Sequence, residues 1–136
     1  MLSPALFSVY MDEILVNLRN LGVGCYVGEV FMGAMGYADD LLLLAPSRTA
    51  MEMMLKACED FGSSNNLQFS TNPDPIKSKT KCVFMCGKKK LIKPLPLCLY
   101  GRELPWVKSA THLGNELCGD GTMRGGGHRF FKTVEC

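Results

Sequence analysis

The sequence lacks the long apolar segment that a membrane-spanning helix requires, and it lacks the cysteine and histidine spacing that is typical of a zinc site. Its opening apolar stretch, residues 2–11, is interrupted by Asp12 and Glu13 and follows no basic segment, so we expect neither a signal peptide nor a membrane anchor. Its seven cysteines contain no CxxC pair, and its two histidines show no regular ligand spacing. A zinc site is therefore weakly indicated. We instead expect buried, reduced cysteines in an intracellular protein of the nucleus or the cytoplasm.

Basic residues are scarce in the first half of the chain and abundant in the second. With 136 residues and 47% hydrophobic content, the sequence predicts one folded domain at most and argues against disorder. Residues 1–76 carry three basic and nine acidic side chains, whereas residues 77–136 carry twelve basic and four acidic ones. A basic half suits a polyanionic partner such as nucleic acid, and an ordinary solvated basic surface fits the count equally well.

The most informative stretch is a pair of adjacent carboxylates, Asp39 and Asp40, between the apolar runs 31–35 and 41–45. Runs of this length predict two strands, with the acidic pair at the turn of a hydrophobic hairpin. Isolated carboxylates are costly to bury, so this turn needs either solvent or a cation. Oxygen-rich, doubly negative sites suit Mg²⁺, with Mn²⁺ as an alternative, and two-metal nucleotidyl transfer uses such sites. A solvated acidic turn is the plain alternative.

Two amphipathic helices and several strands are expected around this hairpin. Ser3 and Pro4 predict a helix start, and apolar residues at three- and four-residue spacing continue from there to a stop at Gly22. Pro46 ends the second apolar run, and Ser47 is the expected cap of a second helix. The remaining apolar runs predict strands at residues 67–69, 82–86 and 111–117, and a strand at residues 25–31 with a turn or bulge at Gly28 and Glu29. Two further strands, at residues 97–100 and 103–107, are expected to flank a turn at Gly101 and Arg102.

In this order, the segments resemble the palm of reverse transcriptases, most closely those of non-LTR retrotransposons, across residues 1–118. The matching segments are Leu2–Phe7 with Tyr10, the tetrapeptide Tyr37–Asp40, residues 72–81, and residues 104–114, which resemble the connection from palm to thumb. The resemblance implies an α+β fold, a split βαββαβ palm sheet. Its first strand, which holds a third metal-binding carboxylate in the family, is expected to be absent because the chain starts at Met1. The glycine-rich residues 119–136 are expected to be a disordered tail.

The resemblance also implies the chemistry of an RNA-directed DNA polymerase, which extends a DNA primer on an RNA template with deoxynucleotides and Mg²⁺. Asp39 would be a main metal ligand and Asp40 a supporting one. Lys79 would neutralise the departing pyrophosphate, although Lys77 and Lys81 are close enough to share that role.

Four further residues would contact the substrates by the same resemblance. Ser3 and Pro4 would belong to the segment that supports the template and the incoming nucleotide, and Tyr37 would pack beside the primer end. Trp106 would stack near the primer strand, and packing in the core is an equally good reading of this residue.

Three readings of function stay open on the sequence alone. The chain is expected to be a reverse transcriptase palm fragment that is inactive by itself, because the third carboxylate and the fingers are missing. It is alternatively a non-catalytic nucleic-acid-binding remnant, or a decayed open reading frame with no activity. An unrelated Mg²⁺ enzyme would leave the flanking matches unexplained. The remnant would bind nucleic acid through Lys77, Lys79, Lys81, Lys88, Lys89, Lys90 and Lys93.

Overall fold

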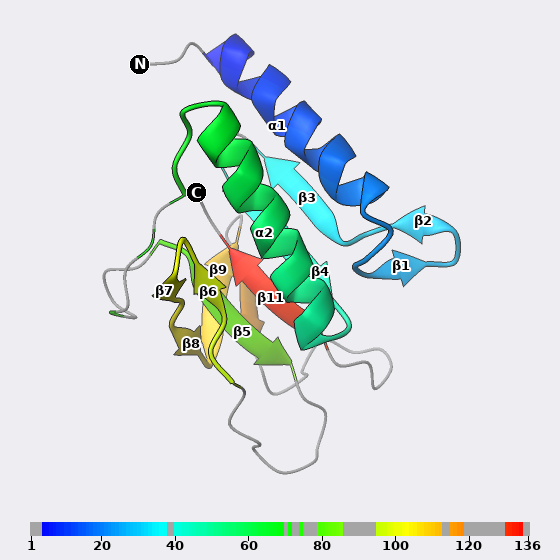
Figure 1. Cartoon of the computed structure of the whole chain (residues 1–136). Helices are drawn as coiled ribbons and strands as arrows, with labels where there is room; N and C mark the ends of the chain where they lie inside the picture. The colour runs from blue at the N-terminus through cyan, green and yellow to red at the C-terminus, as the bar shows by residue number, and fades with distance from the viewer. Residues whose placement is uncertain are drawn as a thin grey trace.

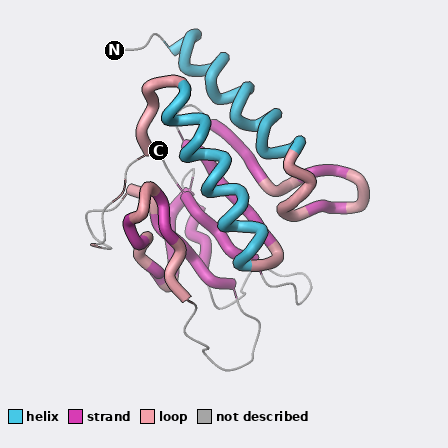
Figure 2. The backbone as a smooth tube through the Cα atoms, viewed as in Figure 1, coloured by secondary structure: helices cyan, strands magenta, loops and turns pink. Residues whose placement is uncertain are grey.

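The fold is built from two helices and a mixed sheet, seen in a computed structural model that describes residues 4–37, 40–69, 71, 74, 79–85, 95–112, 115–118 and 130–134. Helices α1 (Pro4–Asn20) and α2 (Arg48–Ser64) lie on the same face of the sheet (Figures 1 and 2). The five strands are, in spatial order, β3 (Ala34–Tyr37), β4 (Asp40–Ala45), β11 (Phe130–Val134), β5 (Lys81–Met85) and β8 (Trp106–Val107). The expected α+β class is confirmed. Neither helix of the described chain is long and apolar enough to cross a membrane.

The centre of the sheet is occupied by a strand from the far end of the sequence. β11 is antiparallel to β4 on one side and to β5 on the other, so β4 and β5 run parallel to each other. Val134 of β11 is paired with Leu42 of β4 and with Lys81 of β5, which fixes the relative level of the two flanking strands. The segment β4–α2–β5 is therefore a split βαβ unit whose two strands are joined only through β11.

The C-terminal strand corrects part of the sequence-based expectation. Residues 119–136 were expected to be a disordered tail, but Phe130–Val134 form β11, and the rest of that range lies outside the described residues. Phenylalanine, threonine and valine favour extended backbone, and a central position lets each strand amide pair with a neighbour. The position between β4 and β5 is thus filled by this strand.

Short hairpins replace some of the longer strands expected from the sequence. Residues 25–31 form two strands around a turn at Gly28 and Glu29, where the sequence predicts a turn or bulge, and residues 109–118 form a hairpin in place of a single strand at 111–117. The expected strand at 67–69 is absent, and the Phe69 amide instead donates to the Tyr100 hydroxyl at 3.4 Å. The strands concerned are β1 (Tyr26–Val27), β2 (Val30–Phe31), β6 (Cys98–Leu99), β7 (Arg102–Glu103), β9 (Ser109–His112) and β10 (Asn115–Cys118).

Helix α2 begins as the sequence predicts and carries one buried stripe. The Ser47 hydroxyl accepts a hydrogen bond from the Ala50 amide at 3.2 Å, which satisfies one of the free amides at the helix start. The buried side chains of α2 recur at helical spacing and pack on Leu41, Leu43 and Ala45 of β4. They are Ala50, Met51, Met54, Leu55, Cys58 and Phe61.

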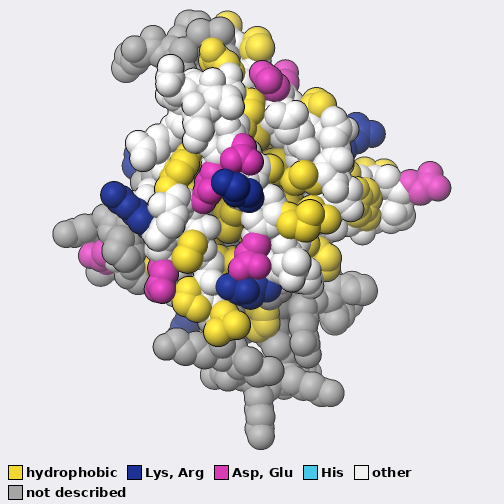
Figure 3. Space-filling view, viewed as in Figure 1, with side chains coloured by type: hydrophobic (Ala, Val, Ile, Leu, Met, Phe, Trp, Pro, Cys, Tyr) yellow, Lys and Arg dark blue, Asp and Glu magenta, His cyan; other side chains and the backbone are white. Residues whose placement is uncertain are grey.

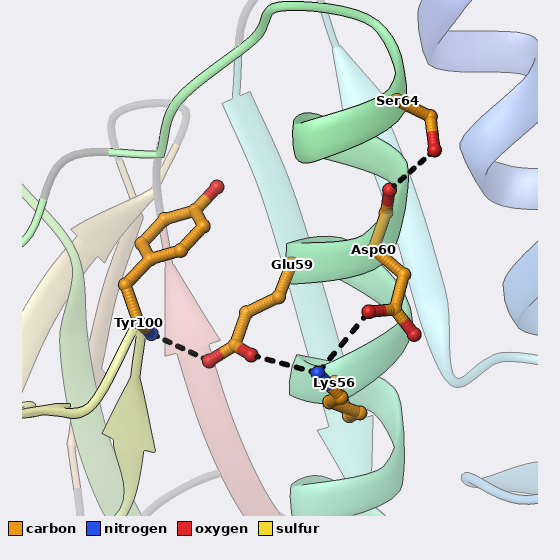
Figure 4. Close-up of polar contacts among 5 residues, drawn as sticks. All are labelled: Lys56, Glu59, Asp60, Ser64 and Tyr100. Carbon is orange, nitrogen blue, oxygen red and sulfur yellow. Dashed lines mark hydrogen bonds and ion pairs between the residues drawn. The ribbon is translucent and has the colours of Figure 1, made fainter.

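The exposed side of α2 carries charged side chains of both signs, and one of them, Glu59, holds the β6–β7 turn in place. The Glu59 carboxylate accepts a hydrogen bond from the Tyr100 amide and also contacts Lys56 Nζ at 3.5 Å (Figure 4). Lys56 Nζ lies 3.1 Å from Asp60 Oδ1, and its hydrogen bonds with Asp60 and Glu59 raise the pKa of this exposed ammonium. Tyr100 has φ +53° and is followed by Gly101 at φ +72°, so the β6–β7 turn falls at Tyr100–Gly101, one residue before the expected Gly101–Arg102 turn.

Candidate catalytic hairpin and metal site

The candidate site is the closed end of the hairpin formed by β3 and β4. Tyr37 is paired with Asp40, so the hairpin predicted from the sequence is present, with residues 38 and 39 between its two strands. Asp40 is half-buried at the first position of β4, and the three leucines that follow it are buried. The apolar strand therefore anchors the Asp40 carboxylate at the rim of the core. Asp39 lies outside the described residues.

Close packing of α1 fixes the first arm of this hairpin. A Cβ atom built on Gly36 would lie 2.8 Å from Met11 Cγ and 3.3 Å from Leu15 Cδ1, so the glycine lets the helix approach β3 directly. Figure 1 shows the first half of α1 above the end of β3 that leads into the hairpin turn. Pro4 begins α1 as predicted, and Ser3 lies outside the described residues.

Lys79 lies at the same end of the sheet as Asp40. Leu42 and Lys81 are level with each other because both are paired with Val134. Asp40 precedes Leu42 by two positions on β4, and Lys79 precedes Lys81 by two positions, in the bend that leads into β5. Two strand spacings, about 9.5 Å, separate β4 from β5. The fold thus brings an exposed lysine and a half-buried aspartate, 39 residues apart in sequence, to one edge of the sheet.

Trp106 lies on β8, the strand that is paired with β5, and has packing partners of its own. Its indole N–H donates to the Leu95 carbonyl at 3.3 Å, and its ring meets Phe84 edge to face with centroids 6.3 Å apart. Trp106 is level with Cys82 in the β5–β8 ladder, and its side chain is half-buried. These contacts give the indole a structural role, and the partial exposure leaves one part of it accessible.

The acidic pair has the donor chemistry for a hard divalent cation. Asp40 presents a partly exposed carboxylate, and Asp39 is its neighbour in sequence, so the two supply the oxygen ligands that Mg²⁺ prefers. Within the described ranges, no group of three or more acidic, histidine or cysteine side chains is assembled. The residues fit an ion that takes its other ligands from water and from phosphate oxygens, as Mg²⁺ usually does.

The feature that the sequence reasoning missed is the strand next to the candidate site. β11 is paired with β4 over four residues and with β5 over five, so it sets the spacing between Asp40 and Lys79. The available signal was the short run Phe130–Val134, which follows three consecutive glycines. Such a run has strand composition, but its two partners lie about 50 and 90 residues away in sequence, and nothing local identifies them.

Comparison with known families assigns the chain to a class. Residues 1–117 match the family described as reverse transcriptase (RNA-dependent DNA polymerase). The chain belongs to the reverse transcriptase family, and the resemblance inferred from the Tyr37–Asp40 hairpin and its flanking segments is confirmed.

The similar curated proteins are polyproteins of R2 elements, which supports a reverse transcriptase of the non-LTR kind. The chain is 35% identical over 92 residues to the "Retrovirus-related Pol polyprotein from type-1 retrotransposable element R2" of Nasonia vitripennis, which covers 68% of this chain and 8% of that protein. It is 35% identical over 71 residues to the type-2 R2DM polyprotein of Drosophila melanogaster, covering 52% of this chain and 7% of that protein. A type-1 R2 polyprotein of Popillia japonica is 32% identical over 87 residues, which cover 60% of this chain and 12% of that protein. The chain thus spans about a tenth of these relatives. No solved structure matches it significantly.

Proposed function

We propose that this chain carries the catalytic hairpin of an RNA-directed DNA polymerase, with Asp39 and Asp40 as its metal-binding carboxylates. The observation that supports this most is the hairpin register. Tyr37 is paired with Asp40 in a chain of the reverse transcriptase family, and Asp39 falls in the two-residue connection between the strands. A connection this short keeps both carboxylates at one end of the sheet.

The sheet and helices are those of a palm in this proposal. The hairpin β3–β4, helix α2 and strand β5 follow one another as in the last part of a split βαββαβ sheet. β11 then stands where such a sheet has its first strand, between the two strands that flank the second helix. Residues 104–114 correspond to the connection from palm to thumb.

The acidic pair would hold Mg²⁺, or Mn²⁺ in its place, with Asp39 as the main ligand and Asp40 in support. When bound, such ions activate the primer hydroxyl and stabilise charge on the attacking and leaving oxygens. Lys79 is suited to attract the triphosphate, because it is exposed in the bend just before β5, at the end of the sheet where Asp40 begins β4. Lys81 is half-buried at the start of β5, so Lys79 is the better placed of the two for a solvent-borne phosphate.

RNA template, DNA primer and deoxynucleotide are the proposed substrates of the complete enzyme. Tyr37 adjoins the acidic pair and would pack beside the primer end. Ser3 and Pro4, at the start of α1, would support the template and the nucleotide. Trp106 would present the accessible part of its ring to the primer strand, while its indole N–H donates a hydrogen bond to the Leu95 carbonyl.

This chain by itself is proposed to be inactive in polymerisation. The strand between β4 and β5 has the sequence Phe-Phe-Lys-Thr-Val, so its described residues offer no third carboxylate to the acidic pair. Loss of one member of a cooperative catalytic group lowers rates by orders of magnitude. Template-dependent primer extension by the purified chain, abolished in Asp39→Asn, would overturn this proposal.

Metal binding is the direct test of the acidic pair, and it needs no catalysis. Mn²⁺ added to the isotope-labelled chain should broaden the NMR signals of Tyr37 and Asp40, and excess Mg²⁺ should restore them. Asp39→Asn should abolish the effect, whereas Asp12→Asn, on the exposed side of α1, should leave it unchanged. Equal broadening in the Asp39→Asn variant would contradict the assignment.

A non-catalytic nucleic-acid-binding role is the second candidate, and the charge asymmetry of the chain favours it. In the basic second half, Lys79 and Lys108 are exposed next to the ends of β5 and β8, and Arg102 is exposed on β7 of the separate β6–β7 hairpin. On the face seen in Figure 3, by contrast, acidic and basic side chains lie together over α2. Nucleic acid would therefore bind at the β5 side and avoid the α2 face.

A further inference from the structure

The central strand of the sheet, β11, is also the last strand in the sequence. β11 follows β10 through residues 119–129, which include five glycines and no proline. β11 is held in place chiefly by its two ladders, with β4 and with β5.

The two walls of this strand position are built by residues that do not belong to β11. Leu43 of β4 and Cys82 of β5 are buried in the same core cluster, together with side chains of α2. α2 also connects β4 to β5 in the chain, and β11 lies between the two strands, which are therefore two strand spacings, about 9.5 Å, apart. Each wall faces the gap with a row of backbone donors and acceptors, which only another extended segment can pair.

We propose that the gap between β4 and β5 is a strand-acceptor site, which β11 fills within one molecule and which β11 of a second copy of this chain can fill in its place. The occupant is defined by the register: five residues, antiparallel to both walls, with Val134 between Leu42 and Lys81. The strand that fits is identical in every copy. This inference concerns the sheet alone and holds whether or not the acidic pair binds metal.

The covalent connection between β10 and β11, residues 119–129, sets the protein concentration at which exchange of β11 between copies becomes visible. A segment that is tethered through a short covalent connection has an effective concentration in about the millimolar range. Exchange between copies should therefore be rare in micromolar solutions of the wild-type chain and should appear as the protein approaches that range. A variant with a damaged β11 should accept an external strand at much lower concentration.

The test uses the full chain with Lys132→Pro and a fluorescent peptide of residues 129–136 under reducing conditions. Proline removes a ladder donor from the middle of β11, which should detach the tethered strand. The variant should bind the peptide at least tenfold more tightly than the wild-type chain does. The same peptide carrying Lys132→Pro should bind neither protein. A folded Lys132→Pro chain that fails to bind the peptide would overturn the proposal, as would equal binding of the two peptides.

A second measurement does not depend on the folding of that variant. Wild-type chains labelled with ¹⁵N and with ¹⁴N are concentrated together to about the tether's millimolar effective concentration and then diluted, and native mass spectrometry scores dimers of mixed mass. Mixed dimers that are absent without the concentration step, and that excess wild-type peptide suppresses, support strand exchange. A chain that stays monomeric at every concentration, or mixed dimers that the peptide does not affect, would refute it.

Discussion

Gly62 shows how a single residue can reverse a general rule of helix stability. Replacing an interior helix glycine by alanine ordinarily stabilises by up to about 1 kcal/mol. A Cβ atom at Gly62 would lie 2.6 Å from the Leu67 carbonyl oxygen and 2.7 Å from Tyr100 Oη, and the former is backbone that cannot easily move. We expect Gly62→Ala to destabilise the chain by about 1–3 kcal/mol in urea unfolding. Ser63→Ala, at an exposed neighbouring position, should be close to neutral. A stabilised Gly62→Ala chain would contradict the close packing of α2 on this loop.

The start of α2 depends on one hydroxyl group. Ser47 accepts the Ala50 amide, and the serine backbone is extended, at φ −144° and ψ 159°. Ser47→Ala should lower the free energy of unfolding by about 1 kcal/mol, because the amide loses its cap. Ser47→Asp keeps an acceptor and should retain most of the stability. Equal losses in the two variants would show that the cap is not the cause.

Cys25 couples the fold to alkaline pH. Burial raises the pKa of its thiol from 9.0 to about 11, because the folded chain disfavours the thiolate. Between these values the unfolded chain loses the proton while the folded chain retains it, so stability should fall as the pH rises from 9.0 to about 11. Urea unfolding of the wild type and of Cys25→Ala should show a steeper decline for the wild type across this window. Parallel curves would contradict the assignment.

At the scale of elements, local signals predicted the two helices and the central hairpin well. Ser47, Pro4 and the apolar spacing placed both helix starts, and the two apolar runs around Asp39 predicted the β3–β4 hairpin. These features depend on residues within four positions of one another. The acidic pair could be predicted for the same reason.

Strand pairing over long sequence distances could not be predicted in this way. The Phe69 amide donates a hydrogen bond to the Tyr100 hydroxyl instead of pairing with a neighbouring strand. No local sequence pattern indicates this contact. The relative position of Leu42 on β4 and Lys81 on β5 depends on Val134, which is paired with both. The sequence therefore identified the candidate residues, and only the fold shows which of them lie at the same end of the sheet.

Hydrogen exchange within β4 should report on β11 directly. The Leu44 amide donates to the Gly33 carbonyl on the β3 side at 2.7 Å, so the amides of Leu43 and Ala45 point to the β11 side in an antiparallel ladder. In Lys132→Pro, the Leu43 and Ala45 amides should exchange faster by NMR, while the Leu44 amide should keep its protection. Loss of protection at all three would indicate general unfolding, and loss at none would contradict the central place of β11.

For the whole molecule, the uneven distribution of charge makes a prediction about nucleic acid that does not require catalysis. Affinity for single-stranded RNA should fall with salt, because each phosphate contact releases counterions and contributes about 0.7 to the log–log slope. Replacing Lys79 and Lys81 together by alanine should therefore reduce that slope by about 1.4, if both contact phosphate. Filter binding at several salt concentrations measures it.

Lys56→Ala is the matched control for this experiment. Its ammonium already lies 3.1 Å from Asp60 Oδ1 and 3.5 Å from Glu59 Oε2, on the mixed-charge face of α2. Lys56→Ala deletes one positive charge, as the substitution of Lys79 or of Lys81 does. It should nevertheless leave the salt dependence of RNA binding unchanged. An equal change of slope per charge in the two variants would mean that RNA responds to net charge alone. A change confined to the Lys79 and Lys81 variant would place the nucleic acid at the edge of the sheet that Asp40 shares.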